Sequence, residues 1–200
     1  MVLTVEPSIA PDSGRDRIMD EAATLFLQRG YEATSLRHIA EVVGMKAGSL
    51  YYHFASKDVL LTEILRRGIE VMHAAFDEAD ATAAHDDSAA RVGAHVRAHL
   101  AALFENGPYT AAHVTTFRTA PDAVRDEIVP GRDAYEARWT LMLAELQDHG
   151  ALRSDIDVNV ARLILFGAMN AAVEWFDVRR GSLDVFASAI TVQFWSGIAA

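Results

Sequence analysis

The chain has 200 residues, 51% hydrophobic and 23% charged, and this balance excludes a disordered protein and indicates one or two folded units. Cysteine is absent, which excludes disulfides, thiol nucleophiles and thiolate metal sites. The formal net charge of −10 argues against a protein that coats nucleic acid non-specifically, and with no signal-peptide pattern or long apolar run we expect a cytoplasmic protein without a membrane span.

Helical periodicity dominates the N-terminal part of the chain, and strand patterns are nearly absent. We expect a disordered leader over residues 1–14, followed by helices over 16–29, 36–43 and 47–54. Ser56 is a good N-cap for a fourth helix, which runs to about residue 80 and joins this part to the rest of the chain.

The C-terminal part also reads as helices that are separated by glycine, proline and polar residues. We expect Pro121 and Pro130 to bracket a turn or two before a long helix that reaches His149. The other predicted helices cover 89–105, 110–118, 158–179 and 183–198. The predicted fold is therefore all-α, with about nine helices in two units.

The charge is distributed unevenly between these two parts. Residues 15–67 contain eight basic and seven acidic side chains, whereas the remainder contains ten basic and 21 acidic ones. A nearly neutral N-terminal segment on an acidic body indicates that the two parts have different tasks, although chance sampling remains the alternative that charge counts leave open.

Two short helices near the N-terminus are joined by a tight turn. Ala40 is small where the helices pack closely, Gly44 supplies the turn conformation that a β-carbon would resist, and Leu50 fills the shared core. This spacing is typical of a helix-turn-helix, which lays its second helix in the major groove of DNA. Many other helical corners share the spacing, so it is moderately specific by itself.

The second helix of this pair has an unusual outer face. Leu50 and Phe54 are spaced to point inward, which leaves small residues, hydroxyl groups, a cation and an imidazole on the other sides. Ala47 and Gly48 would let the backbone approach base edges closely, and the polar groups around them could hold phosphates.

Three motifs in this region resemble the DNA-binding domain of TetR-family transcriptional regulators. They are A-x-x-L-F-x-x-x-G-Y-x-x-T-S from Ala22 to Ser35, I-A-x-x-x-G from Ile39 to Gly44, and G-S-L-Y-Y-H-F-x-S-K from Gly48 to Lys57. The resemblance implies a helix-turn-helix domain over 15–60 and an effector-binding and dimerisation domain over 61–200. It also implies a homodimeric repressor that a small effector releases from a palindromic double-stranded DNA operator.

The resemblance assigns DNA contacts position by position. Arg37 matches a position that can read a base edge, although a solvated helix face would also explain it, and each tyrosine could instead be half-buried core. The residues that match DNA-contacting positions are Ser35, Arg37, Lys46, Ala47, Gly48, Ser49, Tyr51, Tyr52, His53 and Lys57.

The C-terminal part carries a weaker resemblance. The run D-x-x-x-A-R-L-I-L-F-G-A-M-N-A-A-V-E-W-F, from Asp157 to Phe176, is similar to a helix of TetR-family members that respond to acyl compounds. The whole chain is similar to actinobacterial regulators of the degradation of quorum-signal lactones. We therefore expect an acyl or lactone compound as the effector.

Candidate effector contacts combine apolar walls with polar anchors, and Arg118 is the most suggestive cation for a carboxylate, a phosphate or a lactone carbonyl. The candidates are Phe104, His113, Phe117, Arg118, Trp139, Met142, Asn170, Glu174 and Trp175. The last two helices are apolar on broad faces, which predicts a four-helix dimer interface. Its candidate residues are Leu163, Phe166, Gly167, Val173, Phe186, Ile190 and Phe194.

His95 and His99 have the i, i+4 spacing of many zinc sites, but no HExxH motif accompanies them, so a packed or solvated pair is the better interpretation. We expect no cofactor and no metal. Three alternatives stay open: an activator of the same fold, an architectural DNA-binding protein without an effector, and an all-helical enzyme, for which the sequence offers no nucleophile–base motif.

Overall fold

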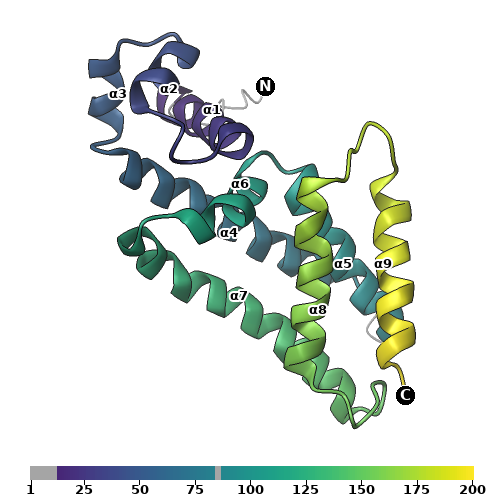
Figure 1. Cartoon of the computed structure of the whole chain (residues 1–200). Helices are drawn as coiled ribbons and strands as arrows, with labels where there is room; N and C mark the ends of the chain where they lie inside the picture. The colour runs from purple at the N-terminus through teal and green to yellow at the C-terminus, as the bar shows by residue number, and fades with distance from the viewer. Residues whose placement is uncertain (1–12, 84–86) are drawn as a thin grey trace, which may run out of the picture.

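The computed structural model describes residues 13–83 and 87–200, and it confirms the predicted all-α fold with nine helices in that part of the chain (Figure 1). None of the helices described is both long and apolar enough to cross a membrane. The helices are α1 (Ser13–Arg29), α2 (Leu36–Val43), α3 (Ala47–His53), α4 (Lys57–Thr82), α5 (Ser88–Phe104), α6 (Tyr109–Thr116), α7 (Asp122–Asp148), α8 (Val158–Ala171) and α9 (Leu183–Ile198).

Helices α1–α3 form a head at one end of the molecule, and α5–α9 form a body at the other (Figure 1). Helix α4 begins beneath the head and continues into the body, where it packs against α5, α6 and α7. Helices α8 and α9 lie side by side along one flank of the body. The one long helix that belongs to both parts is therefore α4.

The head is built as the turn chemistry of its sequence requires. The Ser35 hydroxyl accepts a hydrogen bond from the backbone N–H of His38 at 3.1 Å and so caps α2. Gly44 ends α2 with φ +74°, a conformation that costs an L side chain considerable strain. Leu50 and Phe54 are fully buried, which holds α3 against α1 and α2 as the spacing predicted.

Helix α6 lies unusually close to α4. A β-carbon at Gly68 would come within 2.7 Å of the Tyr109 carbonyl oxygen and 3.0 Å of the His113 β-carbon. The Thr110 hydroxyl donates to the Gly68 carbonyl at 3.2 Å, and His113 Nδ1 donates to the Leu65 carbonyl at 3.0 Å. Glycine at position 68 therefore allows two backbones to touch and two side-chain hydrogen bonds to close the contact.

Helix α6 also contacts the head. The Tyr109 hydroxyl donates to the Asp20 carboxylate of α1 at 2.5 Å, and α6 packs along α1. One short helix therefore contacts both the head and α4.

The predicted helix boundaries are wrong at two places in the C-terminal part. Pro130 does not separate two segments but lies inside a single helix, α7. Proline has no N–H to donate to the carbonyl of Asp126, and because both residues are exposed, water can satisfy that carbonyl. Buried Ile128 and Tyr135, on either side of the proline, keep the helix continuous against the body.

The predicted helix over 158–179 ends earlier, at Ala171, and a 3-10 turn over Ala172–Glu174 follows it. The chain turns here because the Phe176 ring stacks on Phe186 of α9, with 4.7 Å between ring centroids. The predicted leader over 1–14 lies outside the described residues except at its end, where α1 already begins at Ser13.

The α4–α6 contact makes a prediction about stability. Replacing Gly68 by alanine should lower the free energy of unfolding by about 1–3 kcal/mol, because the new methyl group meets backbone atoms that have no room to move. Thermal and urea unfolding followed by circular dichroism would measure the change.

The control is Gly197→Ala, because a β-carbon at this helical glycine of α9 meets nothing within 4 Å. It should leave stability unchanged or raise it by up to about 1 kcal/mol through helix propensity. Equal effects of the two substitutions would contradict the close contact at Gly68.

Candidate nucleic-acid interface and ligand cavity

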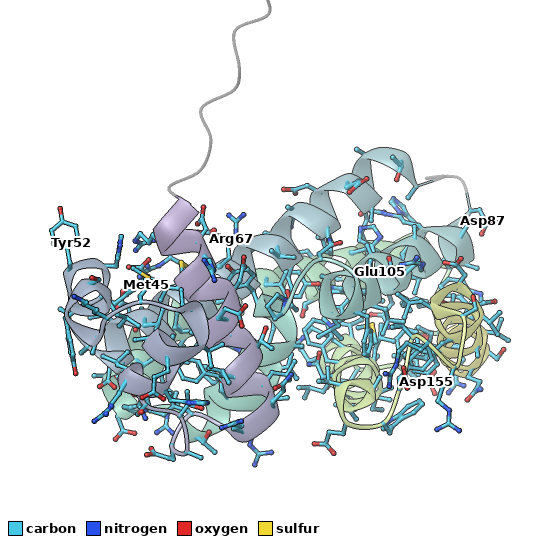
Figure 2. All side chains as sticks on the ribbon, turned by 90° about the horizontal axis from the view of Figure 1, so that it is seen from above. Met45, Tyr52, Arg67, Asp87, Glu105 and Asp155 are labelled. Atoms are coloured by element: carbon cyan, nitrogen blue, oxygen red, sulfur yellow. The ribbon has the colours of Figure 1, made fainter. Side chains whose placement is uncertain are left out.

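The outer edge of α3 is free of protein contacts along most of its length. Tyr52 is 89% exposed and points away from the outer end of the head, and Tyr51 is 55% exposed (Figure 2). Ala47, Gly48 and Ser49 are exposed on the first turn of the same helix, and nothing lies within 4 Å of a β-carbon built at Gly48. The edge is therefore slim, polar and open.

Two cations stand beside this edge. Lys46 is exposed at the N-cap of α3, and the Arg37 side chain on α2 is 84% exposed, with a 3.3 Å contact to Glu41. An ion pair between two exposed side chains one helical turn apart is worth a few tenths of a kcal/mol, so Arg37 can leave it at little cost. His53 is half-buried at the end of α3.

Lys57, by contrast, is held in place. Its ammonium group donates to the Tyr31 carbonyl at 2.9 Å and lies 3.9 Å from the centroid of the Tyr31 ring. Tyr31 is itself buried and its hydroxyl hydrogen-bonds the Asp58 carboxylate. Burial and this carboxylate raise the pKa of the Tyr31 phenol, so the ring stays neutral beneath the cation.

A cavity of about 360 Å³ lies in the body, between helices that are far apart in the sequence. Its walls come from α4 to α8 and from the two 3-10 turns. The lining residues are Met72, His99, His113, Val114, Thr115, Phe117, Arg118, Arg132, Tyr135, Glu136, Phe166, Asn170, Ala171 and Glu174.

Three of the lining residues form a hydrogen-bonded relay across α5, α7 and α8. His99 Nδ1 lies 2.9 Å from the Tyr135 hydroxyl, and His99 Nε2 lies 3.0 Å from Asn170 Oδ1. Burial lowers the pKa of His99 to about 4, so the imidazole is neutral at physiological pH. The relay therefore brings no net charge to the cavity wall.

His113 contributes a second buried imidazole. Its Nδ1 donates a hydrogen bond to the Leu65 carbonyl of α4. Its ring stacks on Phe117 with 5.7 Å between the ring centroids. Among the described residues, Nε2 has no hydrogen-bond partner. Burial, with the positive charge of Arg132, lowers the pKa of His113 to about 4.

The charged groups of the cavity differ in how fully they are paired. Glu136 accepts from Arg162 and lies 3.5 Å from Arg132, whose guanidinium also lies over the Phe117 ring. No carboxylate of the described residues pairs with Arg118, which is exposed at the edge of the cavity. Arg118 is therefore the lining cation that is most available to a ligand.

Five of the nine residues that we predicted as effector contacts line this cavity, and the other four lie elsewhere. Trp139 and Met142 are buried in the core beneath it. Phe104 packs on Phe176, and Trp175 is 62% exposed beside Phe186. The five that line it are His113, Phe117, Arg118, Asn170 and Glu174.

Sequence reasoning missed most of the relay. His99 and Tyr135 were not among the predicted contacts, although a polar residue on the apolar face of a predicted helix is a usable signal. His95, which we considered together with His99, is buried too, but its ring packs on Phe76 at 4.3 Å. The two histidines are therefore a packed pair with separate partners.

The flank formed by α8 and α9 is apolar and exposed. Leu163 is 57% exposed and Gly167 is open, as the predicted dimer contacts require, whereas Phe166 turns inward to the cavity. The remaining predicted contacts, Val173, Phe186, Ile190 and Phe194, are partly buried against the core. Exposed apolar residues that we did not predict on these helices are Val160, Ile164, Val185 and Val192.

Comparison with models of protein families shows which families the sequence matches. Residues 18–64 match the model described as bacterial regulatory proteins, tetR family, and residues 85–191 match the model of the tetracyclin repressor-like C-terminal domain. Together the two models cover the head and most of the body.

One curated relative and two solved structures are similar to most of this chain. The chain is 33% identical over 172 residues to the HTH-type transcriptional repressor KstR2 of Rhodococcus jostii, covering 81% of this chain and 79% of the relative. The structure of the ketosteroid transcriptional regulator KstR2 of Mycobacterium tuberculosis is similar with a TM-score of 0.81 at 24% identity, over 96% of this chain and 97% of that one. The structure of AibR in complex with isovaleryl coenzyme A and operator DNA is similar with a TM-score of 0.80 at 20% identity, over 90% and 97% of the two chains.

The buried imidazole of His113 makes a prediction about pH. Its pKa is about 4 in the folded protein and 6.5 when unfolded, so the unfolded state binds the additional proton as the pH falls. The folded protein should lose roughly 3 kcal/mol between pH 6.5 and pH 4 from this group alone. His113→Asn keeps a donor for the Leu65 carbonyl and removes the titration, so it should flatten the dependence of unfolding free energy on pH.

Urea unfolding at a series of pH values would measure that slope. The control is Thr110→Val, which removes the neighbouring hydrogen bond to Gly68 but no titrating group, so it should lower stability without changing the slope. Identical slopes for the wild type and His113→Asn would show that His113 does not stay neutral in the folded protein.

Proposed function

The chain belongs to the TetR family of bacterial regulatory proteins and is a DNA-binding transcriptional repressor of that type, and we propose that a small acyl compound in the body's cavity releases its homodimer from a palindromic operator. The observation that carries the proposal is the joint presence of an open, cationic α3 edge and a cavity whose wall is tied to the head through α6. In this division of labour, residues 15–60 bind DNA and residues 61–200 bind the effector and the second copy.

The exposed side of α3 enters the major groove in this proposal. Small Ala47 and Gly48 permit close approach, while Lys46 and Arg37 supply charge that can reach base edges or phosphates. The hydroxyl and imidazole groups that flank them hold the DNA backbone. These flanking groups are Ser35, Ser49, Tyr51, Tyr52 and His53.

Lys57 acts differently from the other cations. Because Tyr31 fixes its ammonium group at the first turn of α4, the charge meets a phosphate without having to lose further side-chain freedom. Its contribution should therefore be independent of the DNA sequence.

The second copy docks on the flank of α8 and α9. Leu163, Ile164 and Val192 are each more than half exposed, and an apolar surface of this kind on two adjacent helices favours a twofold four-helix interface. A dimer presents two heads, which must be spaced by about 34–36 Å or a multiple of that distance to enter successive major grooves.

An acyl compound is the effector class that we propose, and two findings support it. The AibR structure, which is similar to this one, is a complex with isovaleryl coenzyme A and operator DNA. In this protein the cavity combines apolar walls with an available cation, Arg118. It can therefore enclose the apolar tail of a ligand and pair with an anionic group of the same ligand.

Helix α6 is the element by which the cavity influences the head. A ligand that displaces α6 disturbs the contact with α4 at Gly68 and the bond from Tyr109 to Asp20 of α1. The head then tilts, and the spacing between the two heads departs from the one that DNA requires. A ligand that fits the tilted state better shifts the population away from DNA.

The proposed DNA interface predicts that two substitutions weaken DNA binding in different ways. Arg37→Ala should weaken operator binding by about 10-fold to 100-fold and affect random DNA less, because a base contact is lost. Lys57→Ala should weaken binding to operator and random DNA alike. It should also reduce the slope of log affinity against log salt concentration by about one. Fluorescence anisotropy at several salt concentrations would measure both.

A matched control is Arg153→Ala, which removes an exposed arginine that pairs with Asp155, far from the head (Figure 2). It should leave both affinities within about twofold. Equal losses of operator and random DNA binding in Arg37→Ala would contradict base reading by that residue.

The effector proposal predicts ligand-induced release. DNA from upstream of the protein's own gene should bind in a gel shift, and at least one member of a panel of acyl coenzyme A thioesters and acyl lactones should release it. Thr115→Phe adds bulk at the cavity wall and should bind DNA but resist release, whereas Val129→Phe adds the same ring on the exposed side of α7 and should respond normally. Failure of every compound to alter DNA binding would contradict the proposed effector class.

A further inference from the structure

In the relay of Tyr135, His99 and Asn170, the chemistry of the three side chains determines which atom donates each hydrogen bond and which accepts it. The Asn170 Oδ1 atom can only accept, so His99 Nε2 must carry the proton that lies between them. A neutral imidazole carries one N–H, so His99 Nδ1 is an acceptor and the Tyr135 hydroxyl donates to it.

The direction of the relay determines what Asn170 offers to the cavity. Its oxygen accepts from His99, and its side-chain nitrogen takes part in no hydrogen bond between the described residues. Asn170 lines the cavity on α8, one turn beyond Phe166, which lines it too. The group that faces a ligand here is therefore an amide donor with two free N–H bonds.

The charge around this donor selects the kind of acceptor. Burial keeps His99 and Tyr135 neutral. Arg132 pairs with Glu136, which Arg162 also contacts, and Glu174 adds a second carboxylate to the lining. A carboxylate at Asn170 would be desolvated without a free cation beside it, which is costly, whereas a neutral carbonyl oxygen would be satisfied by the amide. The cation that remains available, Arg118, is exposed at the edge of the cavity.

We propose that Asn170 is the residue that recognises the effector's acyl group, by donating a hydrogen bond from its side-chain amide to a neutral carbonyl oxygen of a thioester, ester or lactone. Tyr135 and His99 are positioning residues, because they hold the amide with its nitrogen toward the ligand. This inference rests on the proposed effector cavity and adds to it the atom that is read and the residue that reads it.

Paired ligands test the inference directly. Acyl coenzyme A compounds of several chain lengths would be compared with S-alkyl coenzyme A thioethers, which keep the chain and the nucleotide but lack the carbonyl oxygen. Isothermal titration calorimetry on the full-length protein should show that the wild type binds the thioester about 10-fold to 100-fold more tightly than its thioether.

Asn170→Leu should abolish this preference by weakening thioester binding, with thioether binding changed little. Tyr135→Phe should reduce the preference while retaining the aromatic ring, because His99 loses the donor that sets its tautomer. The control is Asn159→Leu, which replaces an exposed asparagine at the start of the same helix and should leave the preference unchanged.

The outcomes separate the two levels of the proposal. Thioesters that bind and release DNA, but no more tightly than their thioethers, would overturn the role of Asn170 and leave the acyl effector standing. An undiminished preference in Asn170→Leu would overturn it in the same way. If neither thioesters, esters nor lactones bind, the proposed effector class fails and the role of Asn170 fails with it. Matched free fatty acids that bind as tightly as the thioesters would contradict the requirement for a neutral carbonyl.

Discussion

The coupling of the cavity to the head that we propose depends on the contact between α4 and α6 at Gly68. Glycine there lets the two backbones meet, and the hydrogen bonds from Thr110 and His113 to carbonyls of α4 fix the position of α6. Because His113 also lines the cavity, the same side chain belongs to the cavity wall and to the contact between α6 and α4. In the proposed mechanism, a rearrangement at the cavity wall reaches α4 through His113 directly.

The head could be predicted closely from the sequence, because its structure follows from local chemistry. Ser35 caps α2, Gly44 ends it with a positive φ, and Leu50 fills the core between the short helices. Each of these roles depends on neighbours within about a dozen residues, which is the range that pattern and turn preferences describe well.

The body was less predictable because its features depend on contacts between distant segments. The relay joins residues 99, 135 and 170, and no local pattern indicates that their side chains meet. Phe166 has the spacing of an interface residue but turns inward, where its ring packs edge-on against Trp139 with 5.5 Å between the ring centroids. Pro130 was expected to interrupt a helix, yet burial of the residues on both sides outweighs the one hydrogen bond that the proline removes.

The apolar core is continuous from the head through α4 into the body. Leu60, Leu61, Ile64 and Leu65 are fully buried on the part of α4 that lies beneath the head, so this segment forms one wall of the head's interior. Recombination between the genes of two such proteins would therefore preserve the interior of the head best when the crossover falls beyond Leu65. A join directly after α3 would give a chimaera whose head rests on a foreign α4 surface.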